Sequence, residues 1–345
     1  MDKDVERQND RFPRTRFMGS KQRLLEFIWT NVEKVPAERV LDAFSGSSCV
    51  AYFLKSMGKE VHTNDFMKYS YMLAKATIEN NNIRLDEEDM NLLFSKNSKF
   101  PSFINDTFGE LYFSKEENKF LDRTYANIQL LDNEYKQAIA LSALARACVK
   151  KRARGIFTFT GNRYDDGRKD LRKSMKEQFI ESTDAFNNAI FDNERNNKSF
   201  NCEIFDIPSA GYDLVYIDPP YFSLRSDNDY SRRYHFVEGL MSYWTHVSIN
   251  HNTKTKKFDK FVTPFDSKST VYDAFYRLFR KFRKSTLVVS YSSNSLPTLE
   301  EMRLLMRMHK SKVTIAEANH RYSFGTQREN LEYNLAKEYL FIGSD

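Results

Sequence analysis

Three short strand-like segments of this chain each carry an aspartate at or near their ends, and this repetition limits the fold more than any other feature. The segments are RVLDAF (39–44), EVHTND (60–65) and YDLVYID (212–218), and the last is an apolar strand. Helical spacing of apolar residues follows the first over 49–58 and the second over about 69–80. This order of strands and helices predicts a Rossmann-like, doubly wound α/β sheet.

The sheet pattern is interrupted once. Residues 84–198 read as largely helical and polar, and strands resume at 286–293, 312–318 and 338–343, of which the last two are expected to form an antiparallel pair. Helices are predicted near 18–34, 234–247, 269–283 and 298–309, and residues 1–16 are expected to form a loose arm. We therefore divide the chain into 1–83, the arm and the first half of the sheet; 84–198, an insertion; and 199–345, the second half.

The strand YDLVYI runs directly into Asp218, Pro219, Pro220 and Tyr221. Ligands of open α/β sheets bind at the carboxyl ends of strands, so these four residues are candidates for a catalytic site. Two prolines fix φ and remove two N–H donors, which leaves a stiff loop that presents carbonyls. The Asp218 carboxylate and the Pro219 carbonyl can accept both hydrogens of a weakly nucleophilic aromatic amine, and Tyr221 offers a face on which an extruded base can stack.

A turn of small residues follows the first strand and suits the close approach of a nucleoside. Asp65 ends the second strand, where an acid can accept both ribose hydroxyls, and Phe66 can pack against an adenine ring. Lys21, in RFMGSK (16–21), can meet the carboxylate of a bound amino acid. The predicted cofactor-binding residues at these places are Phe17, Lys21, Asp42, Phe44, Gly46, Ser47, Asp65 and Phe66.

These motifs, in this order, resemble the Dam-type adenine-N6 DNA methyltransferases (the D12 class, or alpha group). The family pattern F-x-G-x-K is similar to 17–21, D-x-F-x-G-x-G to 42–48, D-P-P-Y to 218–221, and an L-S-Y-like strand to 288–291. Ser48 stands where the family has its second glycine. The resemblance implies S-adenosylmethionine as cofactor, no metal, and an acid upstream of D-P-P-Y that recognises the cofactor's adenine. Asp206 looks like that acid, with Glu203 as the alternative.

The insertion contains a basic stretch, 147–174, with interleaved aromatic residues. The net charge of +6 is mild, so this local concentration matters more than the total. Lysine and arginine can neutralise phosphates, while asparagine and arginine can read base edges. The family's target-recognition domain lies at this place in the chain, so we expect 84–198 to bind DNA. The predicted contacts are Lys151, Arg152, Arg154, Asn162, Arg163, Arg168 and Lys169.

The resemblance implies an enzyme that flips an adenine out of double-stranded DNA and methylates its N6 at a specific sequence. It further implies a monomer in the cytoplasm of a bacterium or archaeon, without a membrane anchor, in a restriction–modification system. N4 of cytosine is the first alternative acceptor, although cytosine enzymes usually carry serine at the position of Asp218. RNA or protein amide methylation, a nicotinamide oxidoreductase and a DNA-binding module without catalysis are further alternatives.

Overall fold

The computed structural model describes residues 3–152, 155–158, 169–223, 229–293, 295–321 and 335–345. The chain forms two compact units. The first comprises 1–17, 67–194 and 230–260, and the second comprises 18–66, 195–229 and 261–345. The predicted arm and DNA contacts therefore fall in the first unit, and the predicted sheet falls in the second.

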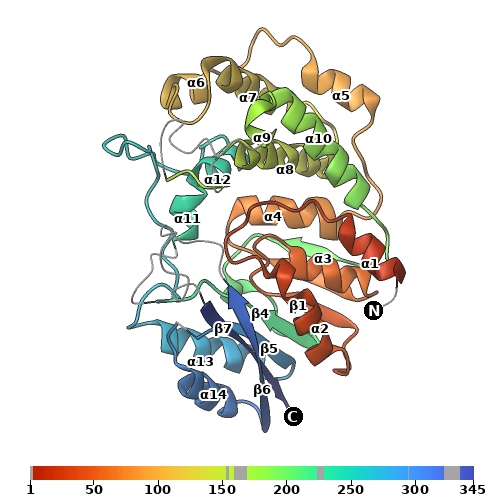
Figure 1. Ribbon diagram of the computed structural model, residues 1–345, viewed down its shortest axis with the longest axis vertical. Coiled ribbons are helices and arrows are strands. Elements are labelled where there is room, and N and C mark those ends of the chain that lie inside the picture. The colour runs from red at the N-terminus through yellow and green to blue at the C-terminus, as the bar shows by residue number, and fades with distance from the viewer. Residues whose placement is uncertain (1–2, 153–154, 159–168, 224–228, 294, 322–334) are drawn as a thin grey trace. The chain divides into compact units, whose positions relative to one another are not determined.

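The second unit is built on a seven-stranded sheet with the order β3-β2-β1-β4-β5-β7-β6 (Figure 1). The strands are β1 (Arg39–Asp42), β2 (Glu60–Asn64), β3 (Lys198–Phe200), β4 (Leu214–Ile217), β5 (Thr286–Ser292), β6 (Lys312–Arg321) and β7 (Leu335–Ser344). The first five strands are parallel, while β7 runs antiparallel to both β5 and β6. The predicted α/β sheet and its final antiparallel pair are confirmed, and β3 is a strand that the sequence patterns did not indicate.

The strand order reverses between β1 and β4. From β1 the chain builds outward through β2 to β3, and it then returns to place β4 on the other side of β1. The loops that follow β1 and β4 diverge at such a reversal and leave a crevice for ligands. The ends of these two strands carry Asp42 and Asp218, so the sheet order alone brings the two predicted motifs to one place.

Helices cover both faces of this sheet. The elements are the 3-10 turn η1 (Lys21–Arg23), α2 (Leu25–Val32), α3 (Cys49–Ser56), the 3-10 turn η4 (Ile204–Asp206), α13 (Val271–Lys281) and α14 (Leu299–Arg307). Figure 1 shows α13 and α14 on one side of the strands and α2 and α3 on the other. On the first side, Phe275, Phe279 and Met302 pack with Val215 and Val289 in one buried cluster. The burial of these large apolar side chains holds the sheet and its helices together.

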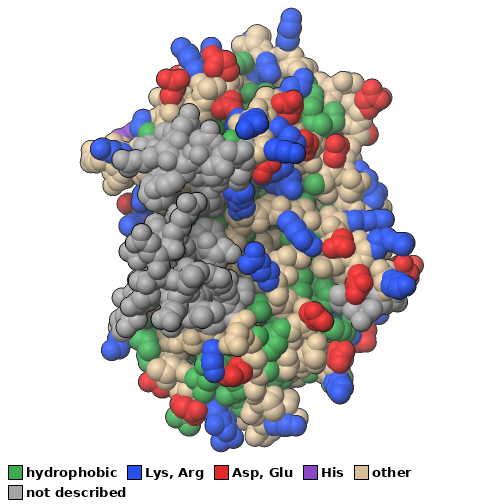
Figure 2. Space-filling view, viewed as in Figure 1, with side chains coloured by type: hydrophobic (Ala, Val, Ile, Leu, Met, Phe, Trp, Pro, Cys, Tyr) green, Lys and Arg blue, Asp and Glu red, His purple; other side chains and the backbone are tan. Residues whose placement is uncertain are grey.

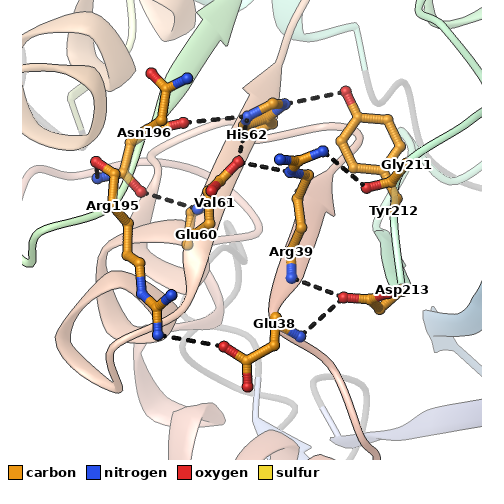
Figure 3. Close-up of polar contacts among 11 residues, drawn as sticks. Glu38, Arg39, Glu60, Val61, His62, Arg195, Asn196, Gly211, Tyr212 and Asp213 are labelled. Carbon is orange, nitrogen blue, oxygen red and sulfur yellow. Dashed lines mark hydrogen bonds and ion pairs between the residues drawn. The ribbon is translucent and has the colours of Figure 1, made fainter.

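A polar network ties the amino ends of the strands together (Figure 3). Asp213, just before β4, accepts hydrogen bonds from the backbone N–H groups of Glu38 and Arg39, each at 2.9 Å. The Arg39 side chain donates to Glu60 at the start of β2. His62 contacts Tyr212 and the segment before β3. These contacts fix the edge of the sheet opposite to the two motifs.

The first unit is a helical assembly. Its elements are α1 (Lys3–Asp10), α4 (Lys68–Ala74), the π-turn η2 (Lys75–Glu79), α5 (Glu87–Phe94), α6 (Phe103–Phe108), α7 (Lys115–Ile128), α8 (Glu134–Lys150), α9 (Lys169–Arg172), α10 (Met175–Ala189), α11 (Tyr230–Arg233) and α12 (His235–Met241). Helix α8 lies at the centre against α10, α4 and α12, and its buried residues include Ala138, Ala140 and Ala143. Such small side chains let neighbouring helices approach closely. The prediction of a largely helical middle is confirmed.

The expectation of a loose arm over residues 1–16 is wrong for its first part, because Lys3–Asp10 is the helix α1. Acidic residues in its first turn suit the helix dipole. Gln8 donates to the carbonyl of Ala189 at the end of α10, and the nearby Phe12 is buried. The segment is polar on its exposed side, which is why its composition alone suggested a loose chain. None of the helices in the described ranges has the length and apolar character that crossing a membrane would need.

Replacing Asp213 with alanine should leave two backbone N–H groups without their acceptor. The expected loss is about 1–3 kcal/mol of unfolding free energy, measured as a lower urea midpoint at an unchanged slope. As a matched control, Glu317→Gln removes an exposed carboxylate that pairs with Lys337, and it should change stability by less than about 0.5 kcal/mol. Equal losses in both variants would show that the amino-edge network does not stabilise the sheet.

Candidate functional site

The turn after β1 adopts a backbone that glycine normally supplies. Gly46 has φ +48, and Ser48, where the resembled pattern has glycine, has φ +63 in the left-handed region. A residue with a Cβ is strained there by roughly 1–2 kcal/mol. The serine therefore preserves the shape of the turn that the motif requires.

Side chains of the second strand and of the η1 segment hold this turn. The Asp65 carboxylate accepts a hydrogen bond from the Gly46 N–H at 2.9 Å. The Ser47 hydroxyl donates to Ser20, which in turn contacts the Cys49 sulfur. The cysteine is buried, and burial raises the pKa of its thiol, so it lacks the character of a nucleophile. The turn is thus fixed from both sides.

Lys21, Asp218 and Tyr221 form a compact polar group. The Lys21 ammonium lies 2.9 Å from each oxygen of the Asp218 carboxylate. The Tyr221 hydroxyl donates to Asp218 Oδ1 at 2.7 Å, and the Lys21 ammonium lies 5.1 Å from the centre of the Tyr221 ring. Lys21 is buried and Asp218 is partly exposed, so the ammonium orients the carboxylate from its protein-facing side. The predicted catalytic aspartate and tyrosine are therefore in direct contact.

Two further carboxyl groups approach this lysine and aspartate from other strands. Burial, together with the nearby Asp218 and Asp65, raises the pKa of Asp42 to about 8. Burial also raises the pKa of Glu338 on β7 to about 7, while the Lys21 ammonium opposes that shift. Near neutral pH, Asp42 is thus largely a neutral acid, and Glu338 titrates. The site gathers more acids than its one lysine can neutralise.

Asp42 has a polar atom that the surrounding protein does not use. Its side chain is 1% exposed, and its Oδ1 has no hydrogen-bond partner among the described residues. A buried acceptor of this kind is costly unless a ligand satisfies it. A positively charged donor would suit it, because such a donor favours the ionised carboxylate.

A narrow pocket lies between the ends of β1, β2 and β4. It is lined by Phe44, Asn64, Phe66, Cys202, Glu203, Ile204, Pro220, Thr263 and Phe265. Phe44 packs edge-on against Phe265 at 5.3 Å, and Asn201 donates to the Phe66 carbonyl at 2.9 Å. Aromatic walls with one acid suit a flat heteroaromatic ring that carries an amino group. Of the two acids considered from the sequence, Glu203 lines this pocket and Asp206 is not among the lining residues.

Phe17 belongs to the first unit. Its buried ring stacks on Tyr234 at 5.0 Å and lies near Tyr69 and Tyr230. These contacts account for its apolar character without a ligand. Its predicted role in cofactor binding stays a prediction.

The predicted DNA contacts differ in their surroundings. Arg152 is buried, and its guanidinium donates to the Tyr112 carbonyl and faces the Tyr112 ring. Lys151 pairs with Glu117 at 2.6 Å, whereas Lys169 is exposed. The other four, Arg154, Asn162, Arg163 and Arg168, lie outside the described residues. Arg152 and Lys151 therefore have structural partners within the first unit.

Sequence reasoning missed several side chains at this site. Glu338 begins the predicted strand 338–343, an acid next to an apolar run, and this is a signal that sequence inspection can detect. Thr263 and Phe265 come from a connection with no motif of its own, and only the folded chain brings them to the pocket. Cys202 and Ile204 likewise belong to the segment between β3 and β4, close to the predicted acids.

Comparisons with known proteins agree with this geometry. A family model described as "D12 class N6 adenine-specific DNA methyltransferase" matches residues 17–304. The chain is 28% identical to the Type II methyltransferase M2.HphI of Haemophilus parahaemolyticus, over 97% of this chain and 98% of that protein. It is 26% identical to the Type II methyltransferase M.FokI of Planomicrobium okeanokoites, over 94% of this chain and 52% of that protein.

Ser48→Gly should stabilise the protein by about 1 kcal/mol, because it relieves the left-handed strain and removes a hydroxyl that has no partner among the described residues. Ser48→Ala removes the same hydroxyl but keeps a Cβ, and so it separates the two effects. Urea unfolding should rank glycine above both serine and alanine. An alanine variant as stable as the glycine variant would refute backbone strain as the cause.

Proposed function

Because the chain belongs to the D12 class of N6 adenine-specific DNA methyltransferases, we propose that it transfers a methyl group from S-adenosylmethionine to an adenine within a specific sequence of double-stranded DNA. The observation that carries the proposal is the Asp218 carboxylate, oriented by Lys21 and Tyr221 at the switch point of the sheet. The class assignment does not favour N4 of cytosine as acceptor.

The residues present fit S-adenosylmethionine. The aromatic and acidic lining of this pocket, with Phe44, Phe66, Phe265 and Glu203, suits the chemistry of an adenine ring, and its volume of about 10 Å³ requires the walls to move apart before the ring can enter. Asp65 lies at the end of β2, where it suits the ribose, and Asp42 Oδ1 suits the ammonium of the methionyl part. When bound, the cofactor supplies an electrophilic methyl group on a sulfonium.

Asp218 and Pro219 prepare the amine of the target base. The lone pair of an adenine amino group is delocalised into the ring, so the amine attacks poorly until it becomes tetrahedral. Hydrogen bonds from its two hydrogens to the Asp218 carboxylate and the Pro219 carbonyl favour that geometry. Lys21 holds the carboxylate in place, and the two prolines keep the loop from rotating.

Tyr221 supports a base that has left the duplex. The amino group cannot reach the site inside a stacked helix, so the target adenine must be extruded. The ring of Tyr221 is fixed by its hydroxyl bond to Asp218 and by edge-on packing against Tyr291 at 5.1 Å. A fixed ring loses little freedom when a base stacks on it.

We assign DNA recognition to the first unit, which contains the predicted domain 84–198. Lys169 is exposed and suits a phosphate contact, and the four residues outside the described ranges keep their predicted roles. Arg152 suits such a contact least, because its guanidinium already faces Tyr112. The name Type II methyltransferase, which both relatives carry, supports a restriction–modification setting, for which we propose a partner endonuclease. We propose that the enzyme acts in the cytoplasm as a monomer, one strand at a time.

Asp218→Ala should lower methylation by at least about 10²-fold, because it removes one of two acceptors for the amine. The measurement is nucleoside mass spectrometry of unmethylated duplex DNA after incubation with labelled S-adenosylmethionine. The wild type should produce N6-methyladenine, and Glu317→Gln, an exposed change on β6, should match it. Retained turnover in Asp218→Ala would remove its catalytic role, and N4-methylcytosine from the wild type would identify the other acceptor.

Binding of S-adenosylmethionine at pH 7 should release more protons, up to about one, from the wild type than from Asp42→Asn. A carboxyl group of pKa about 8 is mostly protonated at pH 7, and a bound ammonium would favour its ionised form. Calorimetry in two buffers of different ionisation enthalpy measures the released protons. Equal release from both proteins would place the ammonium elsewhere.

A further inference from the structure

Five cationic side chains from one short segment line a single cavity of the second unit. The cavity has a volume of about 590 Å³ and is lined by Phe205, Ser209, Ala210, Arg277, Arg280, Lys281, Arg283 and Lys284. All five cations lie between positions 277 and 284, at the end of α13 and in the turn before β5. We call this feature the basic cavity. No role considered above involves it.

The charge of the basic cavity is not balanced by its walls. None of the eight lining residues that the structure describes carries a carboxylate. Arg277 lies 3.7 Å from Asp273, a pair in which both side chains are more than half exposed. An ion pair this exposed contributes little to the stability of the fold. A concave surface lined by one sign of charge focuses its field and attracts the opposite charge.

Phe205 positions part of this wall. The Arg277 guanidinium lies over the Phe205 ring at 4.4 Å from its centre, and the Lys281 ammonium donates to the Phe205 carbonyl at 2.8 Å. Arg280, Arg283 and Lys284 are exposed. Contacts with Phe205 thus hold Arg277 and Lys281, and Arg280, Arg283 and Lys284 are open to an incoming anion.

Stabilisation of the helix explains only part of the cluster. Cations in the last turn of α13 interact favourably with its dipole, which accounts for Arg280 and Lys281. Arg283 and Lys284 lie beyond the helix end, and five neighbouring like charges repel one another. Arg283 and Lys284 therefore have no part in stabilising the helix through its dipole, and a bound polyanion would give them one.

The basic cavity lies at the opposite edge of the sheet from the catalytic group. Lys284 comes two residues before β5, at the amino edge, whereas Asp218 follows the carboxyl end of the neighbouring β4 (Figure 1). β5 has seven residues, so the two edges are roughly 20 Å apart. Phosphates bound in the cavity would therefore not belong to the nucleotides around the flipped base.

We propose that the basic cavity binds the phosphate backbone of a DNA segment other than the one being methylated. The substrate of this class is itself a long polyanion, so a second stretch of it is always close by. Figure 2 shows acidic and basic side chains intermixed over most of the face that it presents, which contrasts with the single sign of the cavity. Such a site would keep the enzyme on long DNA between turnovers.

The test compares two triple variants with equal loss of charge. The cavity variant is Arg280→Gln/Arg283→Gln/Lys284→Gln, and the control is Lys34→Gln/Lys59→Gln/Lys198→Gln, in the same unit but outside the cavity. The probe is poly(dG)·poly(dC), which contains no adenine and so offers the catalytic group no target base. Affinity is measured against salt concentration, and urea midpoints check that both variants fold.

The cavity variant should flatten the salt dependence by about two to three units of slope relative to the control, since each lost phosphate contact contributes about 0.9. The wild type should also have a lower KM for long DNA than for a short single-site duplex, and the cavity variant should lose this difference, with kcat on the short duplex unchanged. Equal slopes in both variants would overturn the proposal. So would a cavity variant that stops binding inorganic phosphate yet keeps the wild-type salt slope for the duplex, because the site would then take a small anion.

Discussion

The buried ammonium of Lys21 is the interaction on which the site depends. Parallel pairing of β1 with β4 brings Asp42 and Asp218 together, and β7 adds Glu338. Acids this close would repel one another without a cation, and most of their surroundings are apolar. One lysine, carried by a short turn ahead of α2, supplies that charge and at the same time aims Asp218. The Lys21–Asp218 ion pair therefore both stabilises the site and orients the proposed catalytic carboxylate, so a substitution of Lys21 would affect both.

Much of the fold was predictable because it follows from local patterns. Alternation of strands and helices predicted the sheet, and the residues at the ends of β1 and β4 indicated the candidate cofactor turn and the candidate catalytic motif. The polar composition of the first ten residues led to the wrong prediction of a loose arm, because a surface helix with acids at its start is as polar as a loose segment. The positions of Thr263 and Phe265 in the pocket wall could not be predicted from the sequence, since they depend on contacts between residues far apart in the chain.

Charge was the least reliable guide from sequence. The stretch around Lys151 and Arg152 has the composition of a nucleic-acid surface, yet its two central cations are engaged with Glu117 and Tyr112. The segment 277–284 contains no motif that indicates a site, yet its cationic side chains line one cavity. A count of lysine and arginine records how many charges a segment holds. Only the packing decides whether each points inward to a partner or outward to solvent.

The position of β7 has a consequence for synthesis on the ribosome. This strand is made after β5 and β6, yet it lies between them and pairs with both. Until residues 335–344 emerge, β5 has an open edge, β6 has no neighbour, and Glu338 is absent from the surroundings of Lys21. A nascent chain can therefore assemble β1 to β5 and still lack a finished site.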